Sequence, residues 1–239
     1  MNPNESPEPL NPNPQSPFWD YTDFLLFVLL AGSSLAVSLL AGVAFTKLSI
    51  PLKLLLAQIL WYVLAFAALK ALLLFRYDRP FWQSLGWLPI SFSGAAGAIL
   101  AGPFLALSVS LLGAALHTPE INLPFEDMLG SSGTKILLGL LVVILGPVAE
   151  ELAFRGFLMP LLIRSLGTAG GIILTGIIFG SVHGYEYQWS WQFMLLISLV
   201  GCVLGWAKHK TQSTVASALM HSTFNLTQFA AFLLQQRSI

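Results

Sequence analysis

Charged residues are scarce in this chain. Only 9% of its 239 residues are Asp, Glu, Lys or Arg, whereas a typical soluble domain has about 25%. Its 11 basic and 11 acidic residues cancel, so the chain has no basic field that would attract nucleic acid. Because 56% of the residues are hydrophobic and the mean hydropathy is +0.76, the composition is typical of a polytopic membrane protein.

Cysteine is also scarce, since Cys202 is the single one. A disulfide within the chain and a thiolate zinc site are therefore excluded, because each needs more than one cysteine. The HExxH motif that marks many zinc proteases is absent as well. Neither a disulfide framework nor a familiar zinc motif organises this protein.

What the sequence has in abundance is long hydrophobic runs. A hydrocarbon core of about 30 Å needs around 20 apolar residues per helix. On this measure we expect an all-α, polytopic transmembrane helix bundle of about seven spans, with six to eight possible. The expected spans are about 22–46, 52–75, 92–116, 135–160, 168–184, 191–207 and 213–234.

The chain divides into three parts by composition. Residues 1–21 contain six prolines among Asn, Ser, Glu and Gln, and we expect this tail to be disordered because it is too polar to bury an apolar face. Residues 22–129 are expected to form N-terminal transmembrane helices. Residues 130–235 are expected to form a second transmembrane unit, which carries most of the polar residues at membrane depth.

Few strongly polar residues lie within the expected spans. An ionised side chain at bilayer depth costs roughly 2.5–3.5 kcal/mol on insertion scales. The polar residues occur on only three helices, so we expect these helices to face one shared polar cavity. They are Glu150, Glu151, Arg155, His183, His221 and Asn225.

Helix geometry separates these residues into groups. Glu151 and Arg155 are four residues apart and can form an ion pair on one face. Glu150 is turned by about 100° from its neighbour and is left facing the cavity. His221 and Asn225 are also four apart and share a face.

Two other patterns concern the helices themselves. If Pro147 takes the first position of a new helix, both carboxylates lie in its first turns, where the helix dipole stabilises negative charge. Gly176, Gly180 and Gly184 have fourfold spacing, which lets another helix approach closely. His183 lies on or beside that stripe and is expected to point at a neighbouring helix.

A carboxylate, two imidazoles and an amide suit hydrolysis. Glu150 and one histidine would hold and deprotonate water, while the other histidine and Asn225 would donate hydrogen bonds to the oxyanion. Alternatively, Glu150, His183 and His221 would be three ligands of a divalent metal such as Zn, with water in the fourth position. The residues leave both versions open.

With these residues the chain resembles the CAAX-protease and bacteriocin-processing family of intramembrane proteases, which includes the Ras-converting type of CAAX prenyl endopeptidase. The resemblance covers roughly residues 130–232, and its three motifs occur in order on separate expected spans. The motif residues are Glu150, Glu151 and Arg155, then Phe179 and His183, then His221 and Asn225.

The resemblance implies peptide-bond hydrolysis in a water-filled cavity among the motif helices. It implies that Glu150 activates water, that His183 helps to hold it, and that His221 and Asn225 stabilise the oxyanion. The other motif residues, Glu151, Arg155 and Phe179, would support these groups. Family members are often labelled metalloproteases, although a metal-free glutamate mechanism has also been argued, so the cofactor stays open.

We therefore expect an integral membrane endopeptidase of a prokaryotic plasma membrane. Its expected partners are a peptide or protein substrate at the membrane and the lipid bilayer, with no nucleic acid and no indication of oligomeric state. The main alternative is a non-catalytic membrane scaffold or bacteriocin self-immunity protein, in which the polar cluster only holds helices together. A small transporter is a weaker alternative, because the chain shows no inverted repeats.

Overall fold

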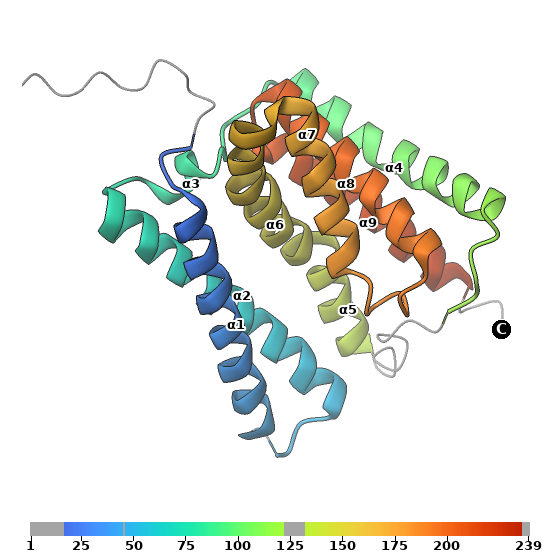
Figure 1. Ribbon diagram of the computed structural model, residues 1–239. Coiled ribbons are helices and arrows are strands. Elements are labelled where there is room, and N and C mark those ends of the chain that lie inside the picture. Colours follow the sequence, from blue (N-terminus) through green and yellow to red (C-terminus); the bar gives the residue numbers. More distant parts are fainter. Residues whose placement is uncertain (1–16, 45, 122–131, 236–239) are drawn as a thin grey trace, which may run out of the picture.

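The computed structural model describes residues 17–44, 46–121 and 132–235 (Figure 1). Residues 1–16 of the expected tail and the expected boundary at 129–130 lie outside the described residues. The regular structure within the described ranges is entirely helical, which confirms the all-α class. The helices are α1 (Tyr21–Ala44), α2 (Ile50–Tyr77), α3 (Phe81–Ser84), α4 (Phe92–Ala115), α5 (Ser132–Leu140), α6 (Gly146–Glu151), α7 (Met159–Val182), α8 (Trp191–Thr211) and α9 (Thr214–Gln235).

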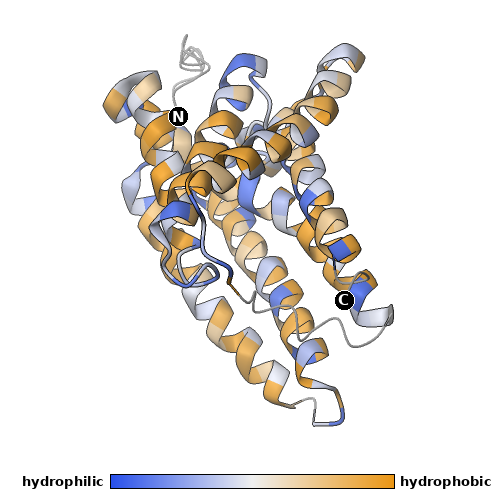
Figure 2. Cartoon of the chain, turned by 90° about the vertical axis from the view of Figure 1, so that its right-hand side faces the viewer, coloured by the Kyte–Doolittle hydropathy of each residue, from blue (hydrophilic) through white to orange (hydrophobic). Residues whose placement is uncertain are grey.

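Five helices in the described part of the chain are long and apolar enough to cross a membrane. They are Tyr21–Ala44, Ile50–Tyr77, Phe92–Ala115, the 50-residue run Gly133–Val182 and Trp191–Thr211. Apolar residues follow the helices along most of their length (Figure 2). Large apolar side chains such as Phe75 and Phe92 are almost fully exposed, as expected for surfaces in contact with lipid. This is the architecture of an integral membrane protein.

Gly167 divides the run Gly133–Val182 into two helices, which correspond to the expected spans 135–160 and 168–184. Its φ of 73° and ψ of 171° are non-helical and mark a kink between them. Glycine adopts such a positive φ at little steric cost. The last expected span, 213–234, is present as α9 but contains more polar residues and is not among the five.

Pro147 is the second residue of α6, but α6 continues directly from the helical residues before it, so Pro147 does not begin a separate helix. Residues Leu141–Leu145 form a π-helical turn, η2, after which the Gly146 N–H donates to the carbonyl of Leu141, five residues earlier. A second π-helical segment, η3 (Leu152–Leu158), follows α6. The expected contribution of a helix N-terminus therefore does not apply to the two carboxylates. Short π segments inside α-helices are frequent at functional sites.

Three helix pairs build the bundle: α1 with α2, α4 with α9, and α7 with α8 (Figure 1). Gly176 and Gly180 provide the close approach of α7 to α8. A Cβ atom on Gly176 would lie 2.8 Å from the Ser198 carbonyl oxygen, and one on Gly180 would lie 2.5 Å from that of Met194. The glycine stripe is thus a helix interface, as its spacing predicts.

The segment before α1 joins the first two helices to the long run. Trp19, in the part of the expected tail that the structure describes, is buried and donates from Nε1 to the Phe157 carbonyl at 3.1 Å. Its ring stacks on that of Phe157 with centroids 5.3 Å apart. Nearby, the buried Asp23 carboxylate pairs with Arg76 of α2 at 3.0 Å. These contacts hold α1 and α2 against η3.

Candidate active site

Glu150, His183 and His221 converge from three elements of the bundle. Glu150 lies on α6, His183 caps the C-terminal end of α7, and His221 lies on α9. The Glu150 Oε2 atom is 3.7 Å from His221 Nε2 and 4.0 Å from His183 Nε2. These separations exceed hydrogen-bond length, so the three groups face one another without bonding directly. The side chains of Glu150 and His183 are 26% and 20% exposed, which leaves them within reach of water.

Hydrogen bonds at Nδ1 orient both imidazole rings. His183 Nδ1 lies 2.7 Å from the Phe179 carbonyl oxygen, and His221 Nδ1 lies 2.9 Å from Glu151 Oε1. A carbonyl or an ionised carboxylate only accepts, so Nδ1 is the donor in each ring. In the neutral form each Nε2 therefore presents a lone pair towards Glu150.

Glu151 is fully buried in a network beneath the cluster. Its Oε1 atom accepts from Arg155 Nη1 at 2.8 Å, on the same helical face. Arg155 Nη2 donates in turn to the Gly201 carbonyl on α8 at 2.9 Å. The structure thus contains the expected pair, and it adds that Glu151 also holds His221. Spacing along one helix could not reveal that second contact, because His221 belongs to another helix.

Phe179 is the packing centre of the site. Its ring centroid lies 4.7 Å from that of His183 and 5.8 Å from that of His221. The Arg155 guanidinium lies over the same ring, with Cζ 4.4 Å from the centroid, in the range of a cation–π contact. A phenylalanine four residues before His183 therefore contacts both imidazoles and the buried arginine.

Asn225 has a contact that sequence reasoning did not anticipate. Its Nδ2 atom donates to the Val142 carbonyl at 2.8 Å. In the five-residue register of η2, the donor to Val142 would be residue 147, but Pro147 has no N–H. Asn225 supplies the missing hydrogen bond. Among the described residues no hydrogen bond joins Asn225 to Glu150 or to either histidine, and its oxyanion role stays a prediction.

Glu186 is a third acid near the cluster, in the loop after His183. It is not among the residues that the sequence pattern selects. Burial raises the pKa of the Glu186 carboxyl; the charge of His183 opposes this shift, and that of Glu150 adds to it. The one sequence feature that links Glu186 to the site is its position three residues after His183. That spacing does not predict that the loop turns back towards the site.

The donor types at the cluster suit zinc, since they are two imidazole nitrogens and a carboxylate. Hydrogen-bonded Nδ1 atoms are also usual in histidines that bind metals. However, no group of three or more His, Cys, Asp or Glu side chains in the described ranges is placed so as to hold a metal ion. Metal binding by Glu150, His183 and His221 therefore stays a prediction.

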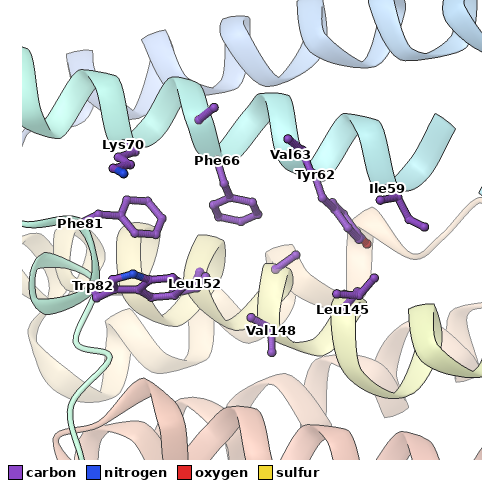
Figure 3. Close-up of a pocket in the computed structure, with 12 residues that line it drawn as sticks. Ile59, Tyr62, Val63, Phe66, Lys70, Phe81, Trp82, Leu145, Val148 and Leu152 are labelled. Atoms are coloured by element: carbon purple, nitrogen blue, oxygen red, sulfur yellow. The ribbon is translucent and has the colours of Figure 1, made fainter. Parts of the chain in front are cut away.

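An apolar cavity of about 360 Å³ lies beside the cluster, between α2 and the run from η2 to η3 (Figure 3). Ala149, the residue before Glu150, is part of its wall. The other lining residues are Ile59, Tyr62, Val63, Phe66, Ala67, Lys70, Phe81, Trp82, Leu145, Val148 and Leu152.

Residues 132–227 match the family model described as "Type II CAAX prenyl endopeptidase Rce1-like". The matched segment contains all three sequence motifs and the residues of the cluster. No match was found among curated proteins or among solved structures. The family match agrees with the resemblance drawn from the motifs.

Proposed function

We propose that the chain is an intramembrane endopeptidase. The match to the family model supports its membership of the CAAX-protease and bacteriocin-processing family. The chain hydrolyses a peptide bond in a membrane-associated peptide or protein. The observation that carries the proposal is the position of Glu150 Oε2 opposite the Nε2 atoms of His183 and His221. The apolar helices support hydrolysis within an integral membrane protein.

In the proposed reaction Glu150 is the general base. A water molecule beside its carboxylate donates a hydrogen bond to the Nε2 lone pair of neutral His183, whose ring is held by the Phe179 carbonyl. Glu150 takes a proton from this water as the oxygen bonds to the scissile carbonyl carbon. The partial exposure of Glu150 and His183 allows that water to enter.

The negative charge that forms on the carbonyl oxygen needs donors. His221 Nε2 is the first proposed donor, and the buried Glu151 carboxylate at Nδ1 holds its ring in place. Asn225 offers the amide hydrogen that is not bonded to Val142. As the tetrahedral intermediate collapses, the C–N bond breaks and Glu150 returns its proton to the leaving amine.

If the site binds a divalent metal such as Zn, the same Glu150, His183 and His221 would hold it. Such a metal would polarise the scissile carbonyl and the attacking water. Elemental analysis of the purified protein and of a His183→Ala, His221→Ala double variant tests this directly. If these side chains bind a metal, we expect the double variant to contain one equivalent less than wild type. Activity that survives complete metal removal would favour a mechanism in which Glu150 activates water without a metal.

Comparative peptidomics of membranes tests the activity and identifies the substrate together. Cells would contain wild-type protein, Glu150→Gln, or Glu120→Gln as a matched control at an exposed carboxylate after α4. We expect cleavage products with wild type and Glu120→Gln that disappear with Glu150→Gln at equal protein level. Identical peptide profiles in all three would reject the protease and favour a scaffold or self-immunity protein.

A further inference from the structure

The residues of the cluster all come from the segment that matches the family model. However, α2 places a polar side chain on the side of Glu150 that faces away from the two histidines. Tyr62 is half-buried and lines the apolar cavity. Its oxygen points across the cavity towards the run that carries Leu145 (Figure 3). The other polar lining groups, Lys70 and Trp82, lie at the far end of the cavity (Figure 3). Tyr62 is therefore the polar group at the end of the cavity near the site.

The position of Gly146 sets an upper limit on the distance between the Tyr62 hydroxyl and the Glu150 carboxylate. A Cβ atom on Gly146 would lie 3.8 Å from the Tyr62 hydroxyl oxygen and 3.8 Å from Glu150 Oε1. The two oxygens thus border the same point and are separated by no more than twice that distance. Because residue 146 is glycine, no side chain of its own occupies the space between them.

The two oxygens of Glu150 consequently have different surroundings. Oε2 faces the two histidines, whereas Oε1 lies on the side of Tyr62 and Gly146. If a peptide presents its scissile carbonyl to Oε2 and the histidines, its neighbouring backbone group can lie on the other side of Glu150, beside Tyr62 and Gly146. The Tyr62 hydroxyl shares a hydrogen bond with the Gln58 side chain, and at the edge of an apolar cavity it can also donate to a backbone carbonyl.

We propose that Tyr62 binds the substrate by donating a hydrogen bond from its hydroxyl to the backbone carbonyl next to the scissile bond, in the space beside Gly146. This inference rests on the proposed protease function. It makes α2, which lies outside the matched residues 132–227, a part of the substrate site.

Trp61 is a matched control on the same helix. Its Nε1 atom donates to the Ala31 carbonyl of α1 at 2.8 Å, so its polar group joins helices rather than facing Glu150. Trp61→Phe removes a structural hydrogen bond, and Tyr62→Phe removes the hydroxyl that we assign to the substrate. Both variants keep an aromatic ring in the same part of α2.

The experiment uses full-length protein in phosphatidylcholine vesicles and a library of internally quenched peptides with apolar central residues. For a peptide cleaved by wild type and not by Glu150→Gln, kcat, KM and thermal unfolding would be measured for each variant. For Tyr62→Phe we expect KM to rise about tenfold, as for one lost hydrogen bond to substrate. Its kcat and unfolding temperature should stay close to wild type. Trp61→Phe should lower the unfolding temperature and leave KM unchanged.

A Tyr62→Phe protein with unchanged KM would overturn the inference. So would one that fails to accumulate in folded form or that loses thermal stability as Trp61→Phe does, because the hydroxyl would then have a structural role. If no peptide is cleaved in a Glu150-dependent manner, the proposed function falls and the inference falls with it. That result is distinct from normal cleavage by Tyr62→Phe, which rejects the role of Tyr62 alone.

Discussion

The two faces of α6 carry the same residue type and do opposite things. Glu151 is fully buried and holds Arg155 and His221 through short hydrogen bonds. Glu150, its neighbour in the chain, is 26% exposed and faces two imidazole nitrogens across longer distances. A rotation of about 100° between adjacent helical residues is enough to separate them. The face with Glu151 forms a buried ion-pair network. The face with Glu150, which we call the reactive face, is the one where the proposed hydrolysis takes place.

His221 connects the two faces, since its Nδ1 atom contacts Glu151 and its Nε2 atom faces Glu150. The buried network therefore also sets the orientation of a group on the reactive side. Variants of Glu150, of the buried Glu151 network and of His221 therefore test whether activity and stability depend on different residues.

The largest expected effect is on the reactive face. Glu150→Gln keeps the shape of the side chain and removes the proposed general base, so kcat should fall by about 10²- to 10⁴-fold. The unfolding temperature should stay close to wild type because Glu150 is partly exposed. Peptide cleavage and thermal unfolding of the same purified sample check both statements, and a large loss of stability would mean that the two faces are not separate.

Breaking the buried face should destabilise the protein. Arg155→Met leaves the Glu151 carboxylate buried without its cation, which we expect to cost about 3–5 kcal/mol in the free energy of unfolding. Adding Glu151→Gln should recover part of this loss, because no uncompensated charge remains. Equilibrium unfolding in detergent measures the stability of both variants. An Arg155→Met protein as stable as wild type would refute the structural role of the pair.

The two histidines should behave differently. His183→Ala is expected to lower kcat with little change in unfolding temperature, because its ring is partly exposed and its hydrogen bond is local. His221→Ala should lower both, since it also removes a partner of buried Glu151. Parallel measurements of cleavage and unfolding compare them, and equal effects on stability would argue against His221 as the connection.

A smaller effect is expected where α9 meets η2. Asn225→Ala leaves the Val142 carbonyl without its donor and should cost about 1–3 kcal/mol. Pro147→Ala restores a backbone N–H at the position that would donate to Val142. The double variant should therefore recover stability relative to Asn225→Ala. Recovered stability without recovered cleavage would separate the hydrogen bond to Val142 from an oxyanion role of Asn225.

Much of this arrangement was visible in the sequence because it depends on local spacing. The four-residue interval between Glu151 and Arg155 predicts their pair, and the same interval in Gly176 and Gly180 predicts a close helix interface. Long apolar runs predict the helical membrane class. These inferences succeed because helical periodicity and the cost of charge in lipid act on each helix alone.

Contacts between helices were harder to predict. No spacing rule connects Glu151 to His221, Asn225 to Val142, or Tyr62 to the space beside Gly146, since each pair belongs to different helices. The π-helical turn before Pro147 was also not predicted, because a proline inside an apolar run is compatible with a kink, a new helix or a π turn.

The sequence by itself determined that this is a helical membrane protein and which polar residues had to share its interior, because burying them singly in lipid is too costly. Only the tertiary structure decided which atoms meet: Glu150 with the two Nε2 atoms, Glu151 with Arg155 and His221, and α2 against the same site. The physical reason is that helix packing, and not residue order, sets the rotation and depth at which each side chain meets its neighbours.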